Sequence, residues 1–131
     1  MIYFWIALGS GIGGVARLAC ADLATWLLGP HFPWGILLIN ALGSFVIGFF
    51  FTFTGPDGRV LVSSTARQFV MTGLCGGYTT FSAFSLDTLN LMRADRLLAA
   101  GANVVLSLAA CLASVWIGHS VAAKLNKPRR R

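Results

Sequence analysis

The residues whose types and spacing could do chemistry gather at positions 73–85, where the sequence reads GLCGGYTTFSAFS. Two adjacent glycines are followed by hydroxyl side chains and two phenylalanines, inside a segment that is otherwise apolar. Non-helical backbone at membrane depth is tolerated where protein buries it or where it lines a water-filled cavity. The stretch therefore predicts a locally broken helix between Gly76 and Thr80, whose carbonyls and hydroxyls serve an ion or solute pathway.

Two kinds of ion chemistry are open to this stretch. Unwound backbone carbonyls offer oxygen ligands, which suit a hard cation such as Na⁺. Phe81 and Phe84 are three residues apart and share a helix face, and the edge of an aromatic ring carries partial positive charge. Two ring edges beside a dry passage could replace part of an anion's hydration shell, although phenylalanine on a membrane helix usually serves packing.

Polar residues also interrupt two other apolar segments. Asn40 lies in the second, where its amide either lines a pore or makes an interhelical hydrogen bond. In the last segment, steps of four, four and three place Asn103, Ser107, Cys111 and Ser114 on one helix face. Such a stripe faces a pathway or a partner helix rather than lipid. For each of these residues taken alone, a hydrogen bond to another helix is as good an explanation as a place in a pathway.

Arg17 lies well inside the first apolar segment. A charged side chain at that depth is costly and is by default a functional hypothesis. It either caps carbonyls or extends to the membrane interface as a structural residue, or it belongs to the site. In both cases it adds positive potential, which favours anions.

Composition places all of these residues in a membrane. Of the 131 residues, 56% are hydrophobic and 11% are charged, against about 25% charged in soluble domains. Four apolar segments, at about residues 3–28, 34–53, 67–92 and 97–122, are each long enough to cross ~30 Å of hydrocarbon. The sequence thus predicts one all-α integral membrane domain, residues 1–131, with four transmembrane helices, the third broken mid-membrane.

The net charge of +6 arises largely from a basic tail at residues 123–131. A basic tail after the last span indicates lipid-facing or cytoplasmic charge, and no soluble basic domain is present to bind nucleic acid. Without the tail, Lys and Arg are balanced between the two sides, so the body of the chain gives almost no instruction on orientation. The tail alone favours termini on the inside.

Enzymatic and nucleotide-binding functions find little support. His31 and His119 have no nucleophile or carboxylate nearby in sequence, so no catalysis is predicted. Residues 9–14 match G-x-G-x-x-G, but within a membrane span these glycines indicate close helix packing instead. Small residues four apart, Ser10 with Gly14 and Ser44 with Gly48, predict further close contacts. Four short helices enclose little interior, so a polar pathway would need a second subunit.

Taken together, these residues resemble the Fluc/CrcB family of fluoride channels over essentially the whole chain. The matching motifs are GGVAR at residues 13–17, GILLINALGSF at residues 35–45 and TGLCGGYTTFSAFS at residues 72–85. The third motif is long and specific, and it carries the assignment by itself.

The resemblance implies an antiparallel, dual-topology homodimer with two pores that exports fluoride passively across a bacterial plasma membrane, the inner membrane in a Gram-negative cell. It also implies a structural Na⁺ at the centre of the dimer interface, held by the carbonyls of Gly76 and Thr79 from both subunits. The family's pore phenylalanines fall on Phe81 and Phe84, and its first-span arginine falls on Arg17.

Fluoride is small and strongly hydrated, so its permeation needs many hydrogen-bond donors in series. The candidate donors are Asn40, which the resemblance also marks, and Ser82, Ser85 and Ser107, with the phenylalanine edges bridging the gaps between them. Cys111 is a weaker donor than the family's polar track would suggest. The basic tail makes the number of Lys and Arg residues unequal on the two sides of the membrane, which favours one orientation. A heterodimer with an oppositely oriented homologue is therefore the alternative to a homodimer.

Two other functions stay open at this stage. A small multidrug exporter also has four short spans, but it needs a membrane-embedded carboxylate, and this chain has no Glu and only Asp22 and Asp87 towards span ends. A structural membrane subunit would carry no flux at all, and the hydroxyl-rich third segment argues against it.

Overall fold

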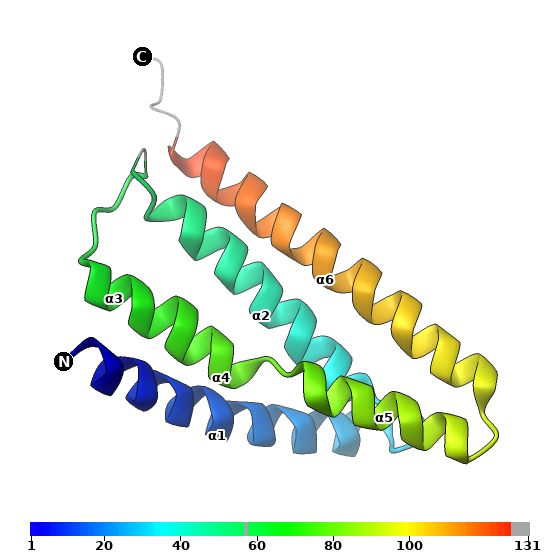
Figure 1. Ribbon diagram of the computed structural model, residues 1–131. Helices are drawn as coiled ribbons and strands as arrows, with labels where there is room; N and C mark the ends of the chain where they lie inside the picture. Colours follow the sequence, from blue (N-terminus) through cyan, green and yellow to red (C-terminus); the bar gives the residue numbers. More distant parts are fainter. Residues whose placement is uncertain (57, 127–131) are drawn as a thin grey trace.

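Helices make up nearly all of the computed structural model, which describes residues 1–56 and 58–126 (Figure 1). Three are long and uninterrupted: α1 (Ile2–Leu28), α2 (Trp34–Phe53) and α6 (Leu97–Asn126). Each is long and apolar enough to cross a membrane, with mean hydropathies of 1.4, 2.2 and 2.0 over 18 residues. The described residues contain no strand, in line with the all-α prediction.

The third apolar segment is built from several shorter pieces. A short helix, α3 (Ser64–Gln68), continues directly into the π-helical stretch η1 (Phe69–Cys75) and then into the single turn α4 (Gly76–Tyr78). After two non-helical residues the chain resumes as α5 (Phe81–Arg93). Because of this division the segment is not among the three helices that could span a membrane alone. The π-helical stretch has no counterpart in the sequence-based prediction.

The interruption lies at Thr79 and Thr80, narrower than the predicted break between Gly76 and Thr80. Thr79 has φ/ψ of −83°/157° and Thr80 has −155°/118°, so both are extended. Gly76 keeps helical angles of −64°/−36°. The two glycines therefore lie in the last helical turn before the break, and the prediction that they form part of it is wrong.

The helix ends differ from the predicted spans at four places, one of them the end of the third segment, which is Arg93 and not residue 92. The first helix starts one residue earlier, at Ile2. The third segment starts at Ser64, because the Ser63 side chain accepts a hydrogen bond from the Ala66 N–H at 3.2 Å and caps the helix. The last helix continues to Asn126, so residues 123–126 of the predicted tail are helical. The remainder of that tail, residues 127–131, lies outside the described residues.

The α2 and α6 helices lie side by side along most of their length (Figure 1). Glycines bring their backbones together: a Cβ at Gly118 would stand 2.9 Å from the Phe49 nitrogen, and one at Gly48 would meet the Val115 carbonyl. Backbone atoms cannot move aside cheaply, so these positions accept no side chain. The predicted packing role of Gly48 is confirmed.

The α1 helix packs against η1 and α4 in the same way. A Cβ at Gly9 would lie 3.0 Å from the Gly73 Cα, and one at Gly13 would lie 2.8 Å from the Tyr78 nitrogen. These glycines thus serve close helix packing, as the sequence indicated, and the resemblance to a nucleotide-binding motif has no structural basis.

The predicted pair of Ser10 and Gly14 is only half correct. The Ser10 hydroxyl contacts the third segment, with its oxygen 3.5 Å from the Gly73 carbonyl oxygen. A Cβ at Gly14 would meet nothing within 4 Å. The close face of α1 is set by Gly9 and Gly13, because helical residues four apart share a face and this pair points at the partner helix.

Arginines in the connections and in the short helix α3 bind carbonyl groups of neighbouring segments. Arg67 donates to the Thr54 carbonyl and hydroxyl at the end of α2. Arg96 donates to the His31 carbonyl, and Arg59 donates to the Leu125 carbonyl near the end of α6. Thr54 and Leu125 lie at helix ends, which leave carbonyls without intrahelical donors. His31 lies in the connection between α1 and α2, so Arg96 joins two connections.

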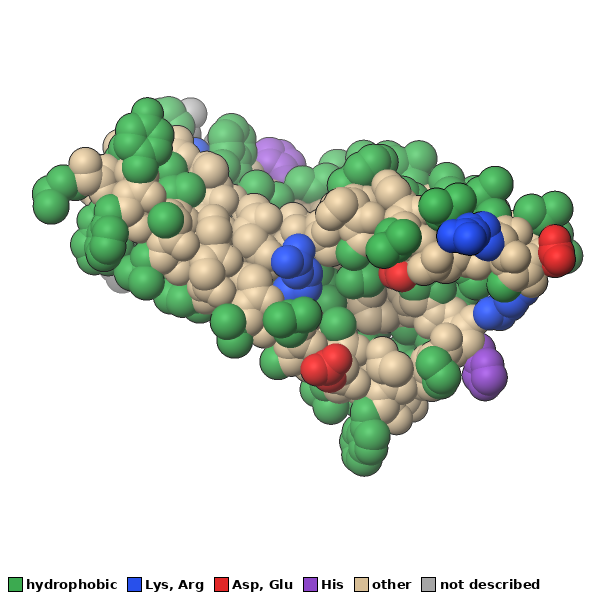
Figure 2. All heavy atoms as spheres, turned by 60° about the horizontal axis from the view of Figure 1, so that its bottom comes forward, with side chains coloured by type: hydrophobic (Ala, Val, Ile, Leu, Met, Phe, Trp, Pro, Cys, Tyr) green, Lys and Arg blue, Asp and Glu red, His purple; other side chains and the backbone are tan. Residues whose placement is uncertain are grey.

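Large apolar side chains cover much of the outer surface. Trp26 is 80% exposed, Leu98 is 92% exposed and Val105 is 65% exposed. Figure 2 shows one face of the molecule, where hydrophobic side chains are widespread and charged ones are few. Such a surface suits hydrocarbon or another apolar subunit rather than water.

Candidate ion pathway at the interrupted helix

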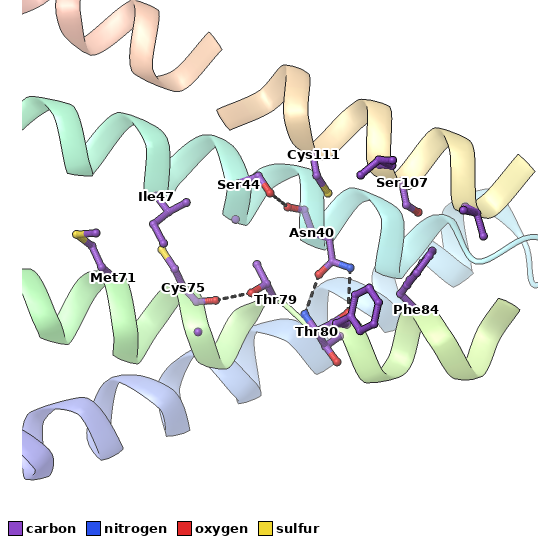
Figure 3. Close-up of a pocket in the computed structure, with 15 residues that line it drawn as sticks. Asn40, Ser44, Ile47, Met71, Cys75, Thr79, Thr80, Phe84, Ser107 and Cys111 are labelled. Carbon is purple, nitrogen blue, oxygen red and sulfur yellow. Dashed lines mark hydrogen bonds between the residues drawn. The ribbon is translucent and has the colours of Figure 1, made fainter. Parts of the chain in front are cut away.

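The side chain of Asn40, on α2, holds the break in the third segment open. Its Oδ1 accepts a hydrogen bond from the Thr80 N–H at 2.7 Å, and its Nδ2 donates to the Thr80 carbonyl at 3.0 Å (Figure 3). The amide therefore pairs with both backbone groups of one extended residue, as a neighbouring strand would. Thr80 is 9% exposed, so these groups would otherwise be buried without partners. Asn40 thus makes the interhelical hydrogen bonds that the sequence had left as one of two options.

Two carbonyls at the break lose their helical donors, one to Asn40 and one to the Thr80 hydroxyl. In a continuous helix the Gly76 carbonyl would accept from the Thr80 N–H, but that N–H donates to Asn40. The Thr79 carbonyl would accept from the Ala83 N–H, which instead donates to the Thr80 hydroxyl oxygen at 3.2 Å. Gly76 and Thr79 are the two residues marked as cation ligands by family resemblance. The donor set, two backbone oxygens per chain released from helical bonding, fits a hard cation.

A cavity of about 570 Å³ opens beside the break. The third segment contributes residues on both sides of the interruption, and α2 and α6 form the opposite walls (Figure 3). Six of the nine predicted site residues line it: Asn40, Gly76, Thr79, Phe81, Phe84 and Ser107. The fold therefore brings together residues that are up to 67 positions apart.

The two phenylalanines lie on the first turn of α5, where the helix resumes. Their ring centroids are 5.4 Å apart and their planes are inclined at 46°. Phe81 is 80% exposed, and Phe84 is partly buried. Both residues line the cavity, and the edge of an aromatic ring carries partial positive charge, which attracts anions.

Not every polar group at the cavity has a proton to offer. The Ser44 hydroxyl donates to the Asn40 carbonyl at 2.7 Å, and the Thr79 hydroxyl donates to the Cys75 carbonyl at 2.9 Å. A hydroxyl has a single proton, so both are already used. Asn40 has two N–H groups and uses one on Thr80. Its second N–H is the donor at the break that remains for a visiting anion.

Three predicted site residues lie away from the cavity lining. Ser82 and Ser85 are exposed on α5. The Ser85 hydroxyl donates to the Phe81 carbonyl at 2.9 Å, while Ser82 contacts the Thr80 hydroxyl at 3.1 Å. Arg17 is half-buried on α1, outside the residues that form this cavity. A single chain therefore does not gather these three with the others.

A chain of side-chain hydrogen bonds connects α5 to α6 behind the cavity. Thr88 donates to the Phe84 carbonyl at 2.8 Å and accepts from Asn103 Nδ2 at 2.9 Å. Ser107 in turn lies 3.4 Å from Asn103 Oδ1. Asn103 is 1% exposed and Ser107 is 6% exposed, so the chain is enclosed in protein.

Sequence reasoning missed two residues with a part in this arrangement. Thr80 supplies the hydroxyl that caps α5 and both backbone groups that Asn40 binds. This role has a local signal in the sequence, because threonine is a preferred residue immediately before the first residue of a helix. Thr88 gave no such signal, because a single hydroxyl in an apolar helix does not reveal a partner on another helix.

The fold and the site define a class: a multi-helix integral membrane protein with a partly polar cavity beside an interrupted helix. Residues 4–119 match the family model of the CrcB-like protein, Camphor Resistance (CrcB). The chain therefore belongs to the CrcB family, and the resemblance found in its sequence is confirmed.

Bacterial relatives cover almost the whole chain. A protein of Methylocella silvestris is 53% identical over 127 residues, covering 97% of both chains. One of Opitutus terrae is 54% identical over 125 residues, covering 95% of both. Each bears the name "Fluoride-specific ion channel FluC". These relatives are named as channels and not as enzymes, which agrees with the absence of predicted catalysis.

Proposed function

We propose that this chain is a subunit of a fluoride-selective channel that lets fluoride leave the bacterial cytoplasm passively. The observation that carries the proposal is the full-length similarity to proteins named as fluoride-specific channels. The cavity beside Thr79 and Thr80 supports it, because non-helical backbone in a membrane domain is tolerated where it lines a water-filled cavity or is buried in protein.

Selective passage requires that protein groups replace the water around the ion without holding it fast. The second N–H of Asn40 supplies one strong donor, and the Ser107 hydroxyl supplies another. The edges of Phe81 and Phe84 provide weaker, partially positive contacts between such donors. Ser82 and Ser85 complete the series from the exposed side of α5.

The proposed active unit is an antiparallel homodimer with two pores in the plasma membrane, the inner membrane in a Gram-negative cell. Phe81 and the two exposed serines of α5 lie at the surface of a single chain, so a second copy is needed to enclose a pathway lined by them. A heterodimer with an oppositely oriented homologue would enclose it equally well. Lipid would cover the apolar outer surface, and Arg17 would add positive potential.

A structural Na⁺ at the centre of the dimer would bind the carbonyls of Gly76 and Thr79 from each subunit. Gly76 is exposed, and a Cβ there would meet nothing within 4 Å, so another subunit can approach its backbone. When bound, the ion would supply charge that fixes four carbonyls together. Loss of Na⁺ from detergent solution is expected to lower the thermal stability of the dimer, and equal stability in Na⁺ and in N-methylglucamine would contradict the site.

The function is tested by fluoride efflux from proteoliposomes, recorded with a fluoride electrode after addition of valinomycin. Rapid loss of fluoride, with chloride retained in a parallel experiment, is the expected result. Well-folded protein that passes no fluoride would overturn the homodimer proposal. Co-expression with a homologue would then show whether a heterodimer is the conducting form.

A further inference from the structure

The Ser107 hydroxyl makes a longer hydrogen bond than most hydroxyls in the part of the chain that the structure describes. Thr72 likewise donates to the side chain four residues earlier, that of Gln68, but at 2.5 Å. Seven other Ser and Thr hydroxyls donate to the backbone carbonyl four residues earlier, at 2.7–3.0 Å. Residue 103 stands four positions before Ser107, yet Ser107 lies against the side chain of Asn103 at 3.4 Å and not against its carbonyl. This is a long bond for a hydroxyl donor, so the Ser107 proton is held weakly.

The direction of each hydrogen bond in this chain follows from chemistry. The Phe84 carbonyl can only accept, so the Thr88 hydroxyl must donate to it. Thr88 then accepts from Asn103, which fixes Nδ2 on the Thr88 side and Oδ1 on the Ser107 side. Ser107 is therefore the donor to Asn103.

We propose that Asn103 is a positioning residue of the permeation pathway, which keeps the Ser107 hydroxyl available to a passing anion. By offering Oδ1 to Ser107, Asn103 draws the proton away from the backbone carbonyl that would otherwise bind it tightly. The hydroxyl then turns from this weak bond to an anion in the cavity, which Ser107 lines, and turns back when the anion leaves. The inference rests on the proposed channel function.

Burial explains why the arrangement persists without an anion. Asn103 is 1% exposed, and its carbonyl oxygen would be costly to leave without a donor. Ser107 satisfies it at rest, and Thr88 satisfies the amide nitrogen throughout. Asn103 itself is not among the residues that line the cavity, so its effect on an anion passes through Ser107.

The test is a double-mutant cycle on fluoride efflux from proteoliposomes. Ser107→Ala and Asn103→Leu are each expected to slow efflux about tenfold, the loss of one net hydrogen bond to a charged group. The double variant is expected to be no slower than either, because without Asn103 the Ser107 proton returns to the backbone carbonyl. Effects that multiply to about a hundredfold would overturn the proposal.

Further variants separate positioning from a general loss of structure. Thr88→Val keeps the side-chain shape but frees the Asn103 amide to turn, so it should slow efflux only when Ser107 is present. It also replaces Asn103→Leu in the cycle if that variant does not fold. Ser114→Ala removes a hydroxyl from the same face of α6 but outside the cavity lining, and it should leave the rate unchanged.

The outcomes distinguish the two proposals. If the unaltered chain passes no fluoride either alone or co-expressed with a homologue, the channel function fails and this inference fails with it. If the unaltered chain conducts and Ser107→Ala or Thr88→Val does so at the same rate, only the role of Asn103 and Ser107 is overturned.

Discussion

The α2–α6 pair and the third segment both combine glycines with polar residues in an apolar sequence. The helices of the pair are continuous, whereas the third segment is interrupted. In the pair, Gly48 and Gly118 let two helices touch along their backbones, and each helix runs without interruption. In the third segment, a side chain from outside takes the Thr80 backbone groups and the helix stops. The continuous pair is the scaffold, and the interrupted segment presents polar groups to the cavity.

Replacing Phe84 by Ile should give the largest effect on function with the least effect on the fold. The side chain remains apolar, but the ring edge that attracts an anion is lost. We expect fluoride efflux to fall by about a hundredfold or more, or ~2.7 kcal/mol on the barrier. Proteoliposome efflux measures the rate, and size-exclusion chromatography of the same sample checks assembly. Undiminished efflux from a native-like assembly would rule out the ring-edge role, and Phe81→Ile should behave in the same way.

Asn40→Leu is expected to damage the interrupted segment most. It removes both partners of the buried Thr80 peptide groups, and each unsatisfied group costs about 1–3 kcal/mol. Thermal unfolding in detergent should therefore show a marked loss of stability, and efflux should be lost with it.

The matched control for Asn40 is one turn further along the same helix. Ser44→Ala removes a hydroxyl that donates only to a carbonyl of its own helix, so its effect on stability should stay within about 1 kcal/mol. Equal unfolding temperatures for Asn40→Leu and the unaltered chain would show that the break does not depend on Asn40.

Gly118→Ala tests the continuous pair. Its Cβ would meet backbone atoms of Phe45 and Phe49, and overpacking of this kind costs about 1–3 kcal/mol. Gly101→Ala, on the same helix with nothing within 4 Å of the new methyl group, should be neutral or slightly stabilising. Unfolding of both variants by heat is the measurement. If Gly118→Ala were as stable as Gly101→Ala, the close contact of α2 with α6 would be refuted.

The smallest effect is expected where the two regions join. Asp95 connects α5 to α6 with φ of 57°, in the left-handed region that favours glycine. Glycine relieves the roughly 1–2 kcal/mol that a side chain costs in this region and adds roughly 0.4–1 kcal/mol of freedom to the unfolded chain. Asp95→Gly should therefore stabilise the protein by about 0.5–1 kcal/mol, the difference between these two effects. Ala94→Gly, at φ of −89°, should instead be slightly destabilising because it only adds freedom to the unfolded chain. A destabilised Asp95→Gly variant would mean that the carboxylate, and not the backbone, matters at this connection.

Much of the fold could be predicted from the sequence because the signals are local. Long apolar runs fixed the three uninterrupted helices to within a few residues at each end, and glycines next to hydroxyl groups marked the third segment as abnormal. The family could also be named, since the motif at residues 72–85 is long enough to be specific.

The exact place of the interruption could not be predicted in this way. The glycines looked like the helix breakers, yet Gly76 is helical and the break falls on two threonines. The cause is Asn40, which lies forty residues away and competes for the Thr80 backbone more strongly than the helix does. Likewise, the fold turns Ser82 and Ser85 away from the cavity of a single chain while Ser107 lines it.

The sequence by itself determined that this chain is helical, apolar and a member of one family, because hydrophobic length and short motifs are properties of consecutive residues. Only the tertiary structure decided which carbonyls lose their helical donors and which hydroxyl keeps a weakly held proton. In each case a hydrogen-bonding group can pair either with the backbone of its own helix or with a side chain. Side chains on other helices come within hydrogen-bond distance only when the helices pack together.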